Sequence, residues 1–248
     1  MPLKLNNIAD EIVKENVAYS ESRIQKQLAK APEQRNLAAL GDAYFELGTG
    51  CYQQQRPIDE IKKYLGLSGE FLTKAIFART KSQHEPTYFE RAFALAVCFG
   101  LPDDVMRGAS LTNEQIFAPN DEQSKKHFGL TLEYVNLLRV FAGSGNLDIE
   151  ATEKVKQKCT TPTAWKFDAI ETKAKLNALE SIQKGNDKQW NEALQILLNE
   201  HQNESLNGEY RKLNAAFIAI PTLVLAKLGL AKGMACTISS DYLPLQLL

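Results

Sequence analysis

The sequence has few of the residues from which metal and redox sites are commonly built. Among its 248 residues there are four cysteines and three histidines. The cysteines are far apart and form no C-x-x-C pair, which excludes the common zinc and dithiol motifs. None of the histidines, His84, His127 and His201, has a second histidine four residues away. We therefore expect no metal ion.

The sequence also has no large excess of charge of either sign. The chain carries 29 Lys and Arg against 30 Asp and Glu, which gives a formal net charge of −1. The two signs are well mixed along the sequence, so no basic face is predicted. A protein that binds a phosphate backbone usually needs such a face. Direct binding to nucleic acid is therefore disfavoured.

The motifs of nucleotide binding and nucleophilic catalysis are incomplete. The segment 143–146, GSGN, lacks the final glycine of a dinucleotide loop, and no predicted strand precedes it. The segment 66–70, GLSGE, departs from G-x-S-x-G at its last position. Cys98 lies in an apolar run, where a core role is favoured. We expect no cofactor and no catalytic residues, and a site assembled in space from distant side chains stays open as a third hypothesis.

Long hydrophobic segments are limited to one uncharged run of fourteen residues at 213–226. A bilayer-spanning helix needs about 17–25 residues, and Pro221 interrupts the run. The first residues have no apolar stretch of the kind found in a secretory signal. Widely spaced cysteines in a chain of this length are typical of a reducing compartment. The sequence therefore predicts a cytoplasmic protein without a membrane partner, in which 213–226 is a buried helix.

Helical periodicity is present almost everywhere, and alternating strand patterns are absent. Helices are predicted over 3–30, 33–54, 57–76, 86–100, from 102, over 122–142, and at about 162–184, 187–203 and 209–229. The fold class is all-α: an irregular bundle or stack of about eight to ten helices. We predict a single domain, 1–248, and 143–146 is the best candidate for a hinge between two lobes. Trp165 and Trp190 are expected to pack in the core.

Two segments are similar to parts of tetratricopeptide repeats. Leu40-Gly41-Asp42-Ala43-Tyr44 fits L-G-x-x-Y of a first repeat helix, and 187–194, DKQWNEAL, resembles the start of a second. They do not recur at the repeat length of about 34 residues. The pattern favours stacked helical hairpins over a regular array. It also supports one reading of function: a helical adaptor or chaperone that binds a peptide segment.

Acidic residues follow prolines at two predicted helix starts. They are Asp103 and Asp104 after Pro102, and Asp121 and Glu122 after Pro119, with Glu114 between the pairs. Such carboxylates commonly accept hydrogen bonds from the first turn of a helix. Alternatively, they form a negative rim that speeds the capture of a basic partner. We take these five residues as candidate partner contacts while keeping the capping interpretation open.

The C-terminal segment, 213–248, carries a more specific pattern. An apolar helix with an internal proline precedes a glycine turn, a short extended piece and a closing S-x-Y-L-P with paired leucines. The matching residues are Pro221, Leu223, Leu225, Gly229, Gly233, Ser240, Tyr242, Leu243, Pro244, Leu247 and Leu248. This segment resembles the C-terminal signature of the immunity protein 49 family of bacterial polymorphic toxin systems.

The resemblance implies an all-α cytoplasmic protein that takes part in interbacterial competition. Such a protein binds and neutralises a cognate toxin, in many cases a nuclease, through a protein–protein complex. It is not an enzyme and needs no cofactor. Toxin contacts vary with the toxin, so the family names none. The tail itself is expected to be structural, with Tyr242 and Leu243 packed against the core.

Overall fold

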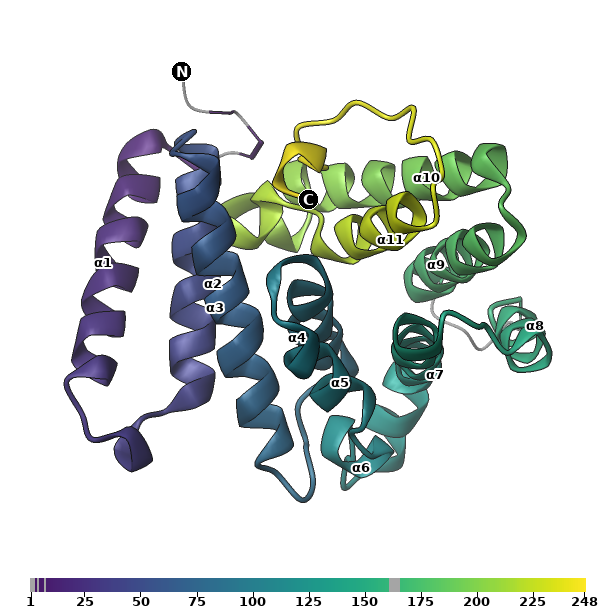
Figure 1. Cartoon of the computed structure of the whole chain (residues 1–248), viewed down its shortest axis with the longest axis horizontal. Coiled ribbons are helices and arrows are strands. Elements are labelled where there is room, and N and C mark those ends of the chain that lie inside the picture. Colours follow the sequence, from purple (N-terminus) through teal and green to yellow (C-terminus); the bar gives the residue numbers. More distant parts are fainter. Residues whose placement is uncertain (1–2, 4, 7, 161–165) are drawn as a thin grey trace.

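The computed structural model describes residues 3, 5–6, 8–160 and 166–248, with the backbone alone for 166–168. Within these residues there are eleven α-helices and no β-strand, so the all-α prediction is confirmed (Figure 1). The helices are α1 Asp10–Leu28, α2 Leu37–Gln53, α3 Ile58–Phe77, α4 Pro86–Phe99, α5 Pro102–Ala109, α6 Asn113–Ile116, α7 Glu122–Ser144, α8 Ile149–Lys158, α9 Lys166–Lys184, α10 Asp187–Leu206 and α11 Ile220–Ala231.

The first four helices pack in the order of the chain, each against the next, and α1, α2 and α3 stand side by side in Figure 1. α2 and α3 form a tight hairpin because Gly41 faces Leu72, whose Cγ lies only 2.5 Å from where a glycine Cβ would be. Tyr44 stacks on Phe71 across the same interface, with ring centroids 5.7 Å apart. The L-G-x-x-Y segment therefore does mark a helical hairpin.

The second half of the fold begins with α7, which packs against α4, α5 and α9. α8 joins it at the edge of the molecule, where Lys156 reaches Glu180 of α9 at 2.5 Å. α9 and α10 form a second hairpin, and Trp190 of α10 is fully buried, as predicted. Trp165 lies outside the described residues.

The predicted helix at 209–229 is divided in the structure. Two short 3-10 turns, Glu209–Lys212 and Asn214–Phe217, come before α11, which begins at Ile220. Pro221 lies in the first turn of α11, where its missing N–H costs no hydrogen bond. The Asn214 side chain holds the preceding turn to α2 by donating to the Glu46 carbonyl at 3.3 Å. The prediction of one continuous helix is thus wrong, and the proline marks its start.

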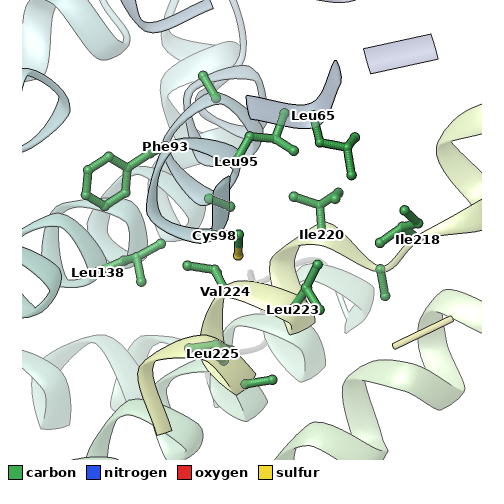
Figure 2. Close-up of a cluster of buried hydrophobic side chains, with 14 of the residues drawn as sticks. Leu65, Phe93, Leu95, Cys98, Leu138, Ile218, Ile220, Leu223, Val224 and Leu225 are labelled. Atoms are coloured by element: carbon green, nitrogen blue, oxygen red, sulfur yellow. The ribbon is translucent and has the colours of Figure 1, made fainter. Parts of the chain in front are cut away.

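α11 lies at the centre of the core. Figure 2 shows Leu223 and Val224 of this helix facing Leu95 and Cys98 of α4. All four side chains are buried. Residues Asn214–Ala231 have a mean hydropathy of 1.7 and would suffice in length and composition for a membrane span, but 67% of them are buried inside the fold. This apolar run serves as packing within the bundle.

The C-terminal tail packs inside the fold, as expected. Tyr242, Leu243 and Leu247 are buried. The Tyr242 hydroxyl donates to the Leu5 carbonyl at 2.5 Å, and its own carbonyl accepts the Ala219 N–H at 2.9 Å. Tyr52 of α2 donates to the Asp241 carbonyl at 2.5 Å. The tail therefore connects α2, the N-terminal segment and the start of α11.

The segment 143–146 is the end of α7. The helix continues to Ser144 and is closed by Gly145, which has φ 72°. The Ser144 hydroxyl accepts the Asn146 N–H at 3.1 Å. One cluster of buried apolar side chains includes residues from α1 through α11. The single domain and its hinge stay predictions.

Candidate functional site

The five acidic residues predicted as partner contacts lie on α5, on α6 and at the start of α7, three helices near one another. Asp103 is exposed in the first turn of α5. Asp104 beside it is 4% exposed and pairs with Arg107 at 2.9 Å. Asp104 therefore belongs to the packed part of the fold, whereas Asp103 faces solvent.

The other three acidic residues are exposed. Asp121 is the N-cap of α7 and accepts the Ser124 N–H at 2.7 Å, which lowers the pKa of its carboxyl. Glu122 pairs with Lys125 at 2.6 Å. Glu114 lies in the first turn of α6. The capping interpretation thus holds for Asp121, and the partner role of Asp103, Glu114, Asp121 and Glu122 stays a prediction.

The surface also has a concave groove, and none of these five acidic residues lines it. Its volume is about 1260 Å³. Side chains from α2, the start of α4, α7, α9, α10 and the two 3-10 turns before α11 line it. All three histidines of the chain contribute to this lining. The three histidines are far apart in the sequence, and no local pattern predicts that they line one groove.

A buried ion cluster lies at the floor of this groove. Lys175 of α9 lies 2.7 Å from Oε1 of Glu90 and 2.6 Å from Oε1 of Glu171. Lys175 and Glu90 are almost fully buried, whereas the Glu171 side chain is 29% exposed in the groove. Lys175 Nζ also lies 5.0 Å from the ring centroid of buried Tyr134. Two carboxylates therefore share one ammonium group.

The ionisation of this cluster follows from its burial. Burial raises the pKa of the Glu90 carboxyl, and Lys175 lowers it. Burial acts to lower the pKa of Lys175, but Glu171 and Glu90 outweigh it, so that pKa is raised. Lys175 is therefore held as a cation at neutral pH.

The groove wall formed by α2 and α4 already holds one guanidinium group. Arg91 Cζ lies 4.8 Å from the ring centroid of Phe45 and 5.2 Å from that of Tyr88. Its Nη2 donates to Oδ1 of Asp42 at 2.6 Å. Burial and the Asp42 carboxylate raise the pKa of Tyr88 to about 12, while Arg91 lowers it. An aromatic face combined with a carboxylate thus binds a cation here.

A second aromatic group in the groove lining is that of His201 and Tyr210. The His201 and Tyr210 ring centroids lie 5.8 Å apart. His201 donates through Nε2 to the Ala216 carbonyl at 2.9 Å. Burial lowers the pKa of His201, and that hydrogen bond and the charges of Glu171 and Glu204 act in the opposite sense. Partial burial raises the pKa of Tyr210, with Glu171 adding to it.

The groove lining combines acidic and aromatic side chains. No group of three His, Cys, Asp or Glu side chains in the described residues is placed to hold a metal ion. Burial raises the pKa of the Cys98 thiol, and Cys98 is a core residue, as predicted. Carboxylates and aromatic faces are groups with which proteins commonly bind cations.

Part of this site could have been found in the sequence. Glu200 and Glu204 are four residues apart on one helix with His201 between them, which places both carboxylates on one face. Glu90 and Lys175 are separated by 85 residues. Their pairing depends on how α4 meets α9, which no local pattern encodes.

The chain was compared with models of protein families, with curated proteins and with solved structures, and none of the three comparisons gives a match.

Proposed function

We propose that this protein is an immunity protein, which binds a cognate secreted toxin in the cytoplasm and neutralises it by forming a tight protein–protein complex. On this proposal the chain acts by occupying a surface of the toxin and is not an enzyme. The toxin is proposed to be a nuclease, because nucleases carry basic surfaces for their phosphate substrates.

The groove is the observation that carries the proposal. Stable complexes bury about 1,200–2,000 Å² in total, and the groove, with a volume of about 1260 Å³, gives an inhibitor a preformed concave part of such a binding face. Little ordering is needed on binding, so less of the contact free energy is lost. The exposed carboxylates of α5, α6 and the start of α7 add a negative rim for the approach of a basic toxin.

The C-terminal tail also supports the proposal. The residues that carry the resemblance to immunity protein 49 are those that close the fold: Tyr242, Leu243 and Leu247 are buried. Pro221 begins α11. A family whose members share one fold but bind different partners would keep such packing residues.

The second candidate is a helical adaptor that binds a peptide segment. The α2–α3 hairpin favours it, because the contact between Gly41 and Leu72 gives the close helix approach that tetratricopeptide hairpins use. This candidate and the first both predict a protein ligand. They differ in whether the ligand is toxic by itself.

Growth rescue tests the proposal. Candidate toxin domains encoded by neighbouring genes are each expressed from an inducible promoter, with and without the present chain. We expect growth only when both are made, and co-purification of the two proteins as one complex. A variant with Leu247→Ala, which disturbs the tail, serves as a folding-defective control. Toxin-expressing cells that stay arrested despite abundant soluble chain would exclude neutralisation, and stable capture of a harmless peptide segment would favour the adaptor.

A further inference from the structure

The charges that line the groove do not balance. Six carboxylates face it, from Glu85, Glu90, Glu171, Glu200, Glu204 and Glu209. Three cations face it, from Arg91, Arg211 and Lys212. Lys175 under the floor and Asp42 beside Arg91 offset each other in this count. The groove is therefore negative in a protein whose formal net charge is only −1.

Several of these carboxylates are available to a ligand. Glu200 and Glu209 form no ion pair within the described residues. Glu204 accepts the backbone N–H of Glu209 at 3.0 Å, which leaves further acceptor positions on its carboxylate. Glu171 shares Lys175 with Glu90. Of these two carboxylates, Glu171 is the one that is exposed in the groove.

Arg91 shows what kind of group this groove accommodates. Its guanidinium lies over Phe45 and Tyr88 and pairs with Asp42. Tyr210 lines the same groove as Glu171 and Glu204, and the charges of these two carboxylates, with that of Lys175, act on it. No cation lies over the Tyr210 ring in the part of the chain that the structure describes. The Tyr210 ring thus has carboxylates near it and no cation over its face, although Arg211 and Lys212 beside it also line the groove.

We propose that the groove binds a basic segment of the partner protein, with one of its arginine side chains placed between the Tyr210 ring and the carboxylates of Glu171, Glu200 and Glu204. Arginine fits better than lysine, because its planar guanidinium stacks on a ring while donating to two carboxylates. This inference rests on the proposed function only in identifying the partner as a toxin. The cation preference of the groove follows from its own residues.

The experiment measures binding of two fluorescein-labelled peptides, hexa-arginine and hexa-glutamate, to the full chain by fluorescence anisotropy at low salt. The groove variant is Glu171→Gln with Glu200→Gln. The matched control is Glu150→Gln with Glu192→Gln, which removes the same charge from exposed positions on α8 and α10. We expect the groove variant to weaken hexa-arginine binding about tenfold and the control less than twofold.

A second variant guards against a folding defect, since Glu171 contacts buried Lys175. Glu200→Gln alone lies outside that ion cluster and is expected to weaken hexa-arginine binding about threefold. Tyr210→Leu, which keeps apolar volume and removes the aromatic ring, is expected to do the same. Absence of hexa-arginine binding, equal losses in the groove variant and the control, or equally tight hexa-glutamate binding would each overturn the inference.

The growth assay separates this inference from the proposed function. Failure of the unaltered chain to rescue growth removes the toxin proposal, while hexa-arginine binding that depends on Glu171 and Glu200 still supports the cation site. Conversely, rescue by the groove variant as strong as by the control, together with unchanged hexa-arginine affinity, removes the cation site and leaves neutralisation intact.

Discussion

Gly229 of α11 lies directly against the indole ring of Trp190 of α10. A Cβ added at Gly229 would lie 2.5 Å from Cε2 of the ring and closer still to Cζ2. The Trp190 side chain is fully buried and has no room to retreat. The close approach of α10 and α11, and with it the position of the groove wall on α10, therefore requires a glycine at position 229.

We expect Gly229→Ala to lower the free energy of unfolding by about 1–3 kcal/mol, because it forces extra volume into a packed interface. Gly129 of α7 provides the control, since an added Cβ there would meet no atom within 4 Å. Gly129→Ala is expected to stabilise by roughly 0.5–1 kcal/mol through helix propensity. Urea unfolding followed by circular dichroism measures both. Equal effects would contradict the packing argument.

The Tyr242 hydroxyl is expected to stabilise the fold through its bond to the Leu5 carbonyl. Tyr242→Phe keeps the ring but leaves that buried carbonyl without its donor, so we expect a loss of about 1–2 kcal/mol in the free energy of unfolding. Tyr19→Phe, at a side chain that is 62% exposed, should change it by less than about 0.5 kcal/mol. Equilibrium unfolding in urea decides between a structural tail and a loosely attached one.

Lys175→Met should be among the most damaging substitutions in the chain. It leaves Glu90 buried without a counter-charge, and breaking a buried pair in this way costs about 3–5 kcal/mol. The double variant Lys175→Met with Glu90→Gln removes the stranded charge and is expected to recover at least half of the loss. Lys154→Met, at an exposed pair with Glu150, is the control and should be nearly neutral. A double variant no more stable than the single one would show that the pair itself is not the cause.

His201 should make stability depend on pH. Burial lowers the pKa of its imidazole below the ordinary 6.5, so the unfolded chain binds a proton more readily than the folded one. The contribution is therefore present above pH 6.5 and is lost as the pH falls from 6.5 through the folded pKa. We expect His201→Gln to flatten the decline in unfolding free energy between pH 7 and 5, with His84→Gln as the control for loss of an imidazole. Parallel declines in His201→Gln and the unaltered chain would assign the effect elsewhere.

The acidic rim is expected to act on the rate of capture. The variant combines Asp103→Asn, Glu114→Gln, Asp121→Asn and Glu122→Gln; asparagine at 121 retains the helix cap. Charges at an interface rim steer association, so we expect the association rate constant with the toxin to fall roughly threefold or more at low salt, with little change in dissociation. Surface plasmon resonance at two salt concentrations measures both rates. An unchanged association rate would leave these residues with structural roles alone.

The sequence predicts the long helices because their apolar residues recur at helical spacing, and prolines 86 and 102 mark two starts correctly. Pro221 marks a third start, which the predicted helix at 209–229 missed. The same periodicity misses α6 and α8, which are short and polar. Both carried a local signal: Thr112 and Gln115 form a capping box, and Asp148 caps α8 by accepting the Ala151 N–H at 2.9 Å. Helices this short have too few apolar residues to show a clear periodicity. They can be predicted only if the capping residues are taken as a signal in their own right.

Most of the candidate site could not be predicted from the sequence. The predicted acidic residues include one, Asp104, that the structure buries in an ion pair with Arg107. The groove instead unites Glu90 of α4 with Glu171 and Glu200 of the hairpin α9–α10, which is distant from α4 in the sequence. Their meeting is fixed by helix crossing and by the ammonium of Lys175, neither of which appears in a one-dimensional pattern.

The bond between Leu5 and Tyr242 joins residues 237 positions apart. During synthesis on a ribosome, the segment around Leu5 must wait until the chain has grown past residue 242 before its partner exists. The α1–α4 layer can form earlier, since its contacts are between neighbours in the chain. The hydrogen bond between Leu5 and Tyr242 therefore forms late. A nascent chain stalled shortly before residue 242 would contain most of its helices and yet remain accessible to proteases.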